Sequence, residues 1–175
     1  MAHLLGMSGS LRKGSYNTML VREAARLFEP SEFTLADLDL PLFNEDVEAE
    51  GWPAPVEMLF EQIRRADAIV IGCPEYNKAF SGVLKNALDW ISRPRPALMA
   101  EKPLALMSAT AGPAGGERSK SAAYLTLIPF KARLILHPEI NIGGASDQFD
   151  AEGRLVNEAK ARALGKLMGA LREAV

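Results

Sequence analysis

The chain has 175 residues, of which 48% are hydrophobic and 24% charged, and its formal net charge is −2. This length predicts one domain, residues 1–175, with a full hydrophobic core. The small net charge gives no general attraction to nucleic acid or to an anionic membrane, so we expect neither as a partner. A single cysteine excludes an internal disulfide, and the two histidines are too far from it in sequence to predict a metal site. With no apolar run long enough to span a membrane and no signal-peptide pattern, we expect a cytoplasmic protein.

Short apolar runs alternate with amphipathic helical patterns along the chain. Strands are expected at residues 3–7, 32–38, 68–73, 103–108 and 133–140, and helices at residues 18–28, 56–66, 82–92, 119–130 and 157–171. Residues 68–71 are apolar at every position, as in a parallel sheet that is covered on both faces. The alternation predicts an α/β fold with three layers, α/β/α, around a flavodoxin-like, doubly wound, five-stranded parallel sheet in the order 2-1-3-4-5.

The loop after the first strand has the composition of an anion site. Residues 8–17 read SGSLRKGSYN, between an apolar strand and a helical pattern. In that position the backbone N–H groups of the loop and the helix dipole both favour a negative charge. Neutral donors and one planar guanidinium add to them: Ser10, Ser15, Asn17, Thr18 and Arg12. A phosphate is the expected occupant, and an ordinary capped turn is the alternative.

Two known nucleotide motifs do not fit this loop. The P-loop requires a lysine after its second glycine, and Ser15 stands at that position. The dinucleotide fingerprint requires two glycines that are two residues apart, whereas Gly6 and Gly9 are three apart. The other loops must therefore show which ligand, if the loop holds a phosphate, carries it.

The loop after the third strand offers an aromatic ring at the same edge of the sheet. Residues 74–82 read PEYNKAFSG, and Pro74 forces the chain to turn. Tyr76 supplies a face on which a flat heteroaromatic ring could stack, and Asn77 supplies a donor and an acceptor for its amide edge. The alternative is that Tyr76 only covers the end of the sheet.

Three motifs together resemble the NADPH-dependent FMN reductase family, most closely its bacterial quinone and chromate reductases. They are SGSLRKGS at residues 8–15, PEYN at residues 74–77 and LKNALDW at residues 84–90, and the resemblance extends to residues 40–44 and 115–118. It implies a flavodoxin-like fold, bound FMN, and a homodimer or homotetramer with the flavins near the subunit interface.

The resemblance also implies roles for individual residues. The FMN phosphate would be held by Ser10, Arg12, Ser15, Asn17 and Thr18, with Tyr16 at the crest of the loop. The isoalloxazine would be lined by Pro74, Glu75, Tyr76 and Asn77, with backbone groups near Ala109 beside the ring or ribityl chain. In the helix that resembles the family's dimer helix, the expected apolar anchors are Leu84, Leu88 and Trp90. Ala79 and Ser81 depart from the family pattern, which has serine and proline there, and the lost proline is expected to loosen the loop.

The implied activity is that of an FMN-dependent NAD(P)H:acceptor oxidoreductase. The hypothesis is a ping-pong cycle in which NADH or NADPH gives a hydride to the flavin, and a quinone then takes two electrons. Chromate, azo or nitro compounds, or free flavin, would be adventitious acceptors. The flavin carries the chemistry, so no catalytic residue is named. The alternatives are a flavodoxin-like electron carrier, which the basic Arg12 and Lys13 disfavour, and a flavin redox sensor.

Overall fold

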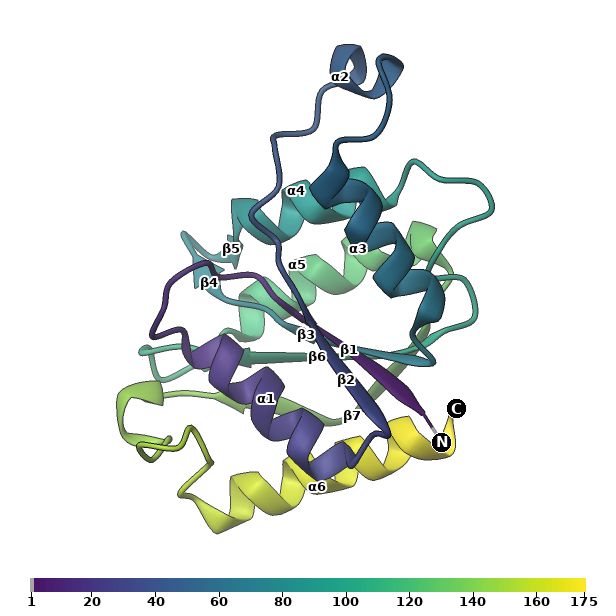
Figure 1. Cartoon of the computed structure of the whole chain (residues 1–175). Coiled ribbons are helices and arrows are strands. Elements are labelled where there is room, and N and C mark those ends of the chain that lie inside the picture. Colours follow the sequence, from purple (N-terminus) through teal and green to yellow (C-terminus); the bar gives the residue numbers. More distant parts are fainter. Residues whose placement is uncertain (1) are drawn as a thin grey trace.

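Five parallel strands build the central sheet of the computed structural model, which describes residues 2–175 (Figure 1). They are β1 (His3–Ser8), β2 (Glu32–Ala36), β3 (Ala68–Gly72), β6 (Pro103–Ala109) and β7 (Arg133–Ile142). Their order is β2-β1-β3-β6-β7, and every neighbouring pair is parallel. This order confirms the predicted flavodoxin-like sheet.

Helices cover both faces of the sheet (Figure 1). One face packs against α3 (Ala54–Arg65), α4 (Gly82–Ile91) and α5 (Glu117–Leu127), and the other against α1 (Tyr16–Phe28) and α6 (Glu158–Glu173). Strands β1, β3 and β6 are buried at every position, because alternate side chains enter the two separate cores. Within residues 2–175, no helix combines the length and apolar character that a bilayer crossing requires.

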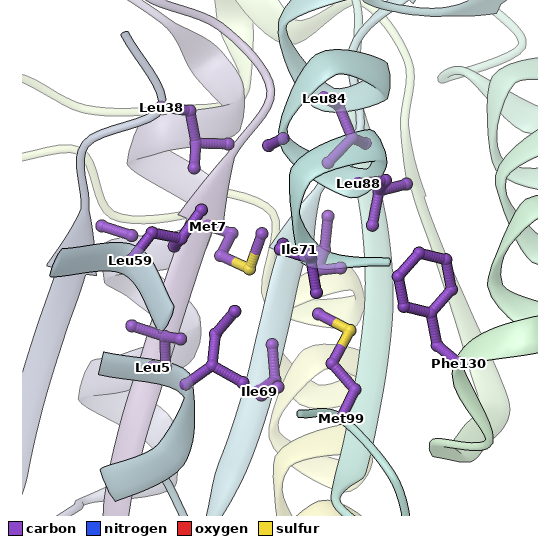
Figure 2. Packing of buried hydrophobic residues seen from close by; sticks show 14 of the residues in the cluster. Leu5, Met7, Leu38, Leu59, Ile69, Ile71, Leu84, Leu88, Met99 and Phe130 are labelled. Carbon is purple, nitrogen blue, oxygen red and sulfur yellow. The ribbon is translucent and has the colours of Figure 1, made fainter. Parts of the chain in front are cut away.

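The core on the α3–α5 side shows how the elements are held together. Figure 2 shows Leu5 and Ile71 from the strands against Leu59 from α3 and Leu88 from α4, all of them buried. Burial of each such leucine or isoleucine stabilises the fold by about 1.5–3 kcal/mol. The sheet thus forms a rigid support for the loops at its ends.

Several short elements lie where the sequence predicted only loops. They are α2 (Glu45–Ala49), the antiparallel hairpin of β4 (Glu75–Tyr76) and β5 (Ala79–Phe80), and the 3₁₀ turn η2 (Ala145–Asp147). A second 3₁₀ turn, η1 (Ile128–Phe130), forms the last residues of the helix expected over residues 119–130. Asn77 and Lys78 connect β4 to β5 with φ values of 51° and 66°. Positive φ at both central residues is typical of a type I′ turn, for which asparagine is a preferred residue. The local sequence therefore favours this turn, although the two-residue strands are too short to show the alternation typical of a strand.

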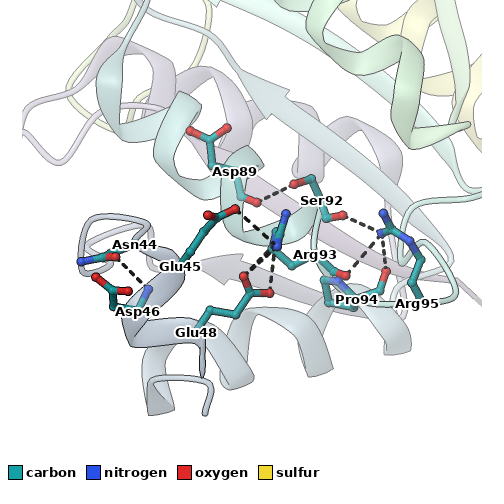
Figure 3. A network of polar contacts seen from close by, with 9 residues as sticks. All are labelled: Asn44, Glu45, Asp46, Glu48, Asp89, Ser92, Arg93, Pro94 and Arg95. Carbon is teal, nitrogen blue, oxygen red and sulfur yellow. Dashed lines mark hydrogen bonds and ion pairs between the residues drawn. The ribbon is translucent and has the colours of Figure 1, made fainter. Parts of the chain in front are cut away.

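The segment after β2, residues 37–53, is fixed to α4 and is called the arm here. The Asn86 amide oxygen accepts from the Phe43 N–H at 2.8 Å, and the Trp90 indole N–H donates to the Pro41 carbonyl at 2.8 Å. Arg93 donates to both carboxylate oxygens of Glu48, at 2.9 Å each, as Figure 3 shows. Helix α2, at the end of the arm, extends beyond the three layers (Figure 1).

Helix α4 does not offer the apolar anchors expected for a partner subunit. Leu84 and Leu88 are 1% exposed and Trp90 is fully buried, all within this chain. The expectation that these three side chains anchor a second copy is therefore wrong. An apolar stripe on a helix has the same spacing whether it faces its own sheet or a partner, and here it faces the sheet.

Candidate functional site

A groove of about 630 Å³ opens at the carboxyl ends of β1, β3 and β6. Three loops contribute its lining: Ser10, Arg12, Ser15, Tyr16 and Asn17; then Pro74, Glu75 and Tyr76; then Ala109, Thr110, Ala111 and Gly112. Of the predicted site residues, only Thr18 and Asn77 are outside this lining. A groove at this edge is where doubly wound sheets bind their ligands, and its size suits a cofactor.

The first wall is the anion loop, residues 9–15, with the start of α1. Ser15 caps α1 by accepting the Thr18 N–H at 3.3 Å. No hydrogen bond within residues 2–175 takes up the N–H groups of Tyr16 and Asn17, nor those of residues 10–14. These donors and the positive end of the helix dipole together form a cradle for an anion.

Arg12 also lines this end of the groove. Its guanidinium donates to the Gly14 carbonyl at 2.8 Å, and its central carbon is 5.3 Å from the centroid of the Tyr16 ring. The side chain is exposed and forms no ion pair with a described carboxylate. Arg12 therefore has donors available for a phosphate.

Asn17 and Thr18 use their side chains inside the protein. The Asn17 amide donates to the Ala109 carbonyl at 2.8 Å, and its oxygen accepts from the Ala109 N–H at 3.1 Å. The Thr18 hydroxyl donates to Ser8 Oγ at 2.8 Å. Asn17 thus joins α1 to the end of β6, and its amide side chain is occupied by both of these hydrogen bonds.

The second wall is the β4–β5 hairpin. Tyr76 is 56% exposed beside the groove, whereas Asn77 lies in the turn of the hairpin. The Glu75 carboxylate accepts the Ser119 N–H at 3.2 Å, in the first turn of α5. Glu75 therefore caps α5, where a negative charge is favoured by the helix dipole.

Ser81 joins the first two walls. Its hydroxyl donates to the Gly9 carbonyl at 2.5 Å and accepts the Leu84 N–H at 3.1 Å, so that it caps α4. A side chain on Gly9 would meet Pro74 and Ser81, which explains the glycine. The serine that stands in place of the family's proline supplies these two hydrogen bonds instead of a ring constraint, and the expected loosening of the loop stays a prediction.

Beneath the groove lie two buried titratable groups. Desolvation raises the pKa of the Cys73 thiol to about 11, which favours the neutral form. Lys120 is 1% exposed, and desolvation lowers its pKa although Glu139 lies 3.3 Å away. Neither residue lines the groove.

The arrangement suits an elongated ligand with an anion at one end and a flat ring at the other. Backbone donors and Arg12 lie at the α1 end, and the exposed Tyr76 ring lies at the hairpin end. The only carboxylate in the described lining is that of Glu75, which is bonded to α5. The site therefore has the means to hold a cofactor, and its side chains do not form a nucleophile–base pair.

Comparison with known proteins gives a consistent result. The model of the family described as NADPH-dependent FMN reductase matches residues 2–147. An NAD(P)H-dependent FMN reductase of Pseudomonas aeruginosa is 46% identical over 163 residues, which are 92% of this chain and 88% of that protein. An NADPH:quinone oxidoreductase of Arabidopsis thaliana is 39% identical over 170 residues, 93% of this chain and 86% of that protein.

A solved structure extends this likeness to three dimensions. The flavoenzyme NAD(P)H:(acceptor) oxidoreductase of Paracoccus denitrificans superposes with a TM-score of 0.89 at 30% identity, covering 99% of this chain and 96% of that one. The family match over residues 2–147 includes all three loops of the groove, and the solved structure covers 99% of the chain. The chain belongs to the NADPH-dependent FMN reductase family.

Proposed function

We propose that this protein is an FMN-dependent NAD(P)H:acceptor oxidoreductase that reduces quinones. The observation that carries the proposal is the groove, which places an anion cradle and an exposed aromatic ring at one edge of the sheet. Family membership and the relatives named as FMN reductase and quinone oxidoreductase support it.

The residues present fit FMN. The free N–H groups of the anion loop and of the first turn of α1, together with Arg12, would hold the phosphate. Ser10 and Ser15 line the same part of the groove. Tyr76 and Pro74 would lie beside the ring, with the backbone near Ala109 beside the ribityl chain. Thr18 and Asn77 belong to this proposal through their places in the two loops, since neither lines the groove.

When bound, FMN supplies two-electron hydride chemistry, with NADH or NADPH as reductant. The chain's own part is to bind and orient. Asn17 fixes the start of α1 against β6, Ser81 fixes the hairpin against the anion loop, and Glu75 secures the start of α5. Preorganised walls of this kind keep a bound ring in one position without a catalytic side chain.

The open groove bears on the choice of acceptor. Because Tyr76 is largely exposed, a reduced ring beside it would face solvent, and small acceptors of several kinds could approach. The relatives named as quinone oxidoreductase support quinones as the main acceptor class. The open groove supports chromate, azo or nitro compounds, or free flavin, as adventitious acceptors. We further propose one FMN-binding domain over residues 1–175, a homodimer or homotetramer, and a cytoplasmic location, the last supported by the single cysteine.

An absorbance spectrum of the purified protein under anaerobic conditions tests the proposal. We expect a flavin band that bleaches when NADPH or NADH is added and returns when a quinone follows. A flavin band that persists with both reductants would favour an electron carrier or a redox sensor. A protein that neither carries nor binds FMN would overturn the proposal.

A further inference from the structure

A turn near the C-terminus places an aromatic ring behind the anion loop. The Phe149 ring is stacked on that of Tyr16, with centroids 6.2 Å apart and planes at 8°. The Arg12 guanidinium lies over the same Tyr16 ring, with its central carbon 5.3 Å from the ring centroid. The spacings are typical of attractive ring–ring and cation–π contacts. The Tyr16 ring therefore connects Phe149 to Arg12.

The turn that carries Phe149 is internally rigid. Phe149 forms an antiparallel bridge with Leu155, and the Val156 N–H donates to the Gln148 carbonyl at 3.0 Å. Asp150 closes the turn by accepting the Arg154 N–H at 2.8 Å. Lys160 of α6 adds a tie by donating to the Gln148 amide oxygen at 2.9 Å.

This turn is also anchored in the core. Leu155 is 8% exposed and packs in the cluster between the sheet and α1 and α6. The position of the Phe149 ring is thus set by the body of the protein rather than by the anion loop itself. The turn begins just beyond residue 147, where the match to the family model ends.

We propose that Phe149 is a positioning residue for the cofactor phosphate, acting through Tyr16 on Arg12. The proposal rests on the proposed function, because it concerns the affinity for FMN. Arg12 is exposed and has a flexible side chain, so free rotation would lower its contribution to binding. Support from Tyr16, which Phe149 holds in place, reduces the number of conformations that Arg12 must give up when a phosphate binds.

The test compares FMN with riboflavin, which lacks the phosphate, by fluorescence titration of the full-length chain. We expect Phe149→Leu to weaken FMN binding roughly three- to tenfold and to leave riboflavin binding unchanged. Phe149→Tyr keeps the ring and should restore the wild-type preference for FMN over riboflavin. Phe33→Leu removes another half-buried phenylalanine of the same core cluster and should leave the preference unchanged.

A double-mutant cycle tests whether Phe149 affects FMN binding through Arg12. In an Arg12→Ala background we expect Phe149→Leu to have no further effect on FMN binding, because the supported group is gone. Circular dichroism checks that each variant folds, and Phe149→Met replaces the leucine variant if that one does not. Equal loss of FMN and riboflavin binding, wild-type FMN binding by Phe149→Leu, or the same loss in both backgrounds would overturn the proposal. If the wild-type chain does not bind FMN, the proposed function fails instead.

Discussion

Two loops leave the same edge of the sheet after neighbouring strands, and they differ in whether their polar groups are paired within the chain. In the anion loop after β1, a run of backbone N–H groups has no hydrogen-bond partner within the described residues, and Arg12 forms no ion pair with a described carboxylate. The arm after β2 is bound to α4 through Asn86 and Trp90, and Arg93 is paired with Glu48 (Figure 3). The unpaired N–H groups at the start of α1 and the Arg12 guanidinium suit the first loop to bind an anion, whereas the hydrogen bonds of the second loop fix it to α4.

The largest effect is expected where the arm meets α4. Trp90 is fully buried and contacts Phe43 and Trp52 edge to face, so Trp90→Ala should lower the free energy of unfolding by about 3–5 kcal/mol. Urea denaturation followed by circular dichroism measures this. Leu42→Ala is the control in the same arm, since Leu42 is 80% exposed, and it should change stability by less than about 0.5 kcal/mol. A Trp90→Ala variant as stable as the wild type would show that the contacts between the arm and α4 do not stabilise the fold.

The second test asks whether a ligand in the groove can reach Cys73, which is buried and does not line the groove. With its pKa raised from 9.0 to about 11, the thiol should react with iodoacetamide at pH 8 about a hundredfold more slowly than an unshifted thiol, and burial slows it further. The alkylation rate, followed by mass spectrometry, should not change when FMN is added. Rapid alkylation that FMN blocks would show that the groove reaches the thiol.

The third test compares two arginines that stand over aromatic rings at the same distance. Arg12 lies 5.3 Å from the Tyr16 ring and Arg93 lies 5.3 Å from the Phe43 ring. Arg12→Ala should weaken FMN binding by about 1.5–3 kcal/mol, roughly ten- to a hundredfold, since under the proposed function it removes charged hydrogen bonds to the phosphate. Arg93→Ala should leave the FMN dissociation constant unchanged in the same titration. Equal effects of the two variants would abolish the distinction between the loops.

The smallest effect concerns Lys120, a cation that is buried next to a half-exposed partner. Its pKa is lowered in the folded chain, so between that value and 10.5 the unfolded chain binds more protons and stability rises with pH. Lys120→Met should therefore be neutral or stabilising at pH 7, with an advantage that shrinks as the pH approaches 10.5. Urea denaturation at pH 7 and pH 9.5 measures this difference. Destabilisation at pH 7 would show that the pair with Glu139 outweighs the cost of burial.

Local sequence patterns predicted most of the architecture. Apolar runs such as residues 68–71 indicate the strands, and turn residues such as Pro74 indicate the loops that follow them. The alternation of strands with helices predicts a parallel, doubly wound sheet, and the structure has that sheet. The groove lining was largely predicted too, because loops after parallel strands meet at one edge.

The missed features depend on contacts between distant residues. The Asn17 side chain is bonded to Ala109, 92 positions away, and Glu75 caps a helix that begins at Glu117. No local period encodes such pairs. No sequence pattern marks Phe149, because a single aromatic residue in a polar turn is common. Only its stacking on Tyr16 in the structure distinguishes it.

Both tryptophans of the chain, Trp52 and Trp90, lie at the junction of the arm with the body, with ring centroids 6.3 Å apart. Intrinsic emission is therefore a reporter of arm docking, and neither indole lines the groove. An unfolding curve recorded by tryptophan fluorescence follows this junction, whereas far-ultraviolet dichroism follows the sheet and helices. If the two curves coincide, the arm and the body unfold as one cooperative unit, and if the fluorescence transition comes at lower denaturant, the arm detaches first.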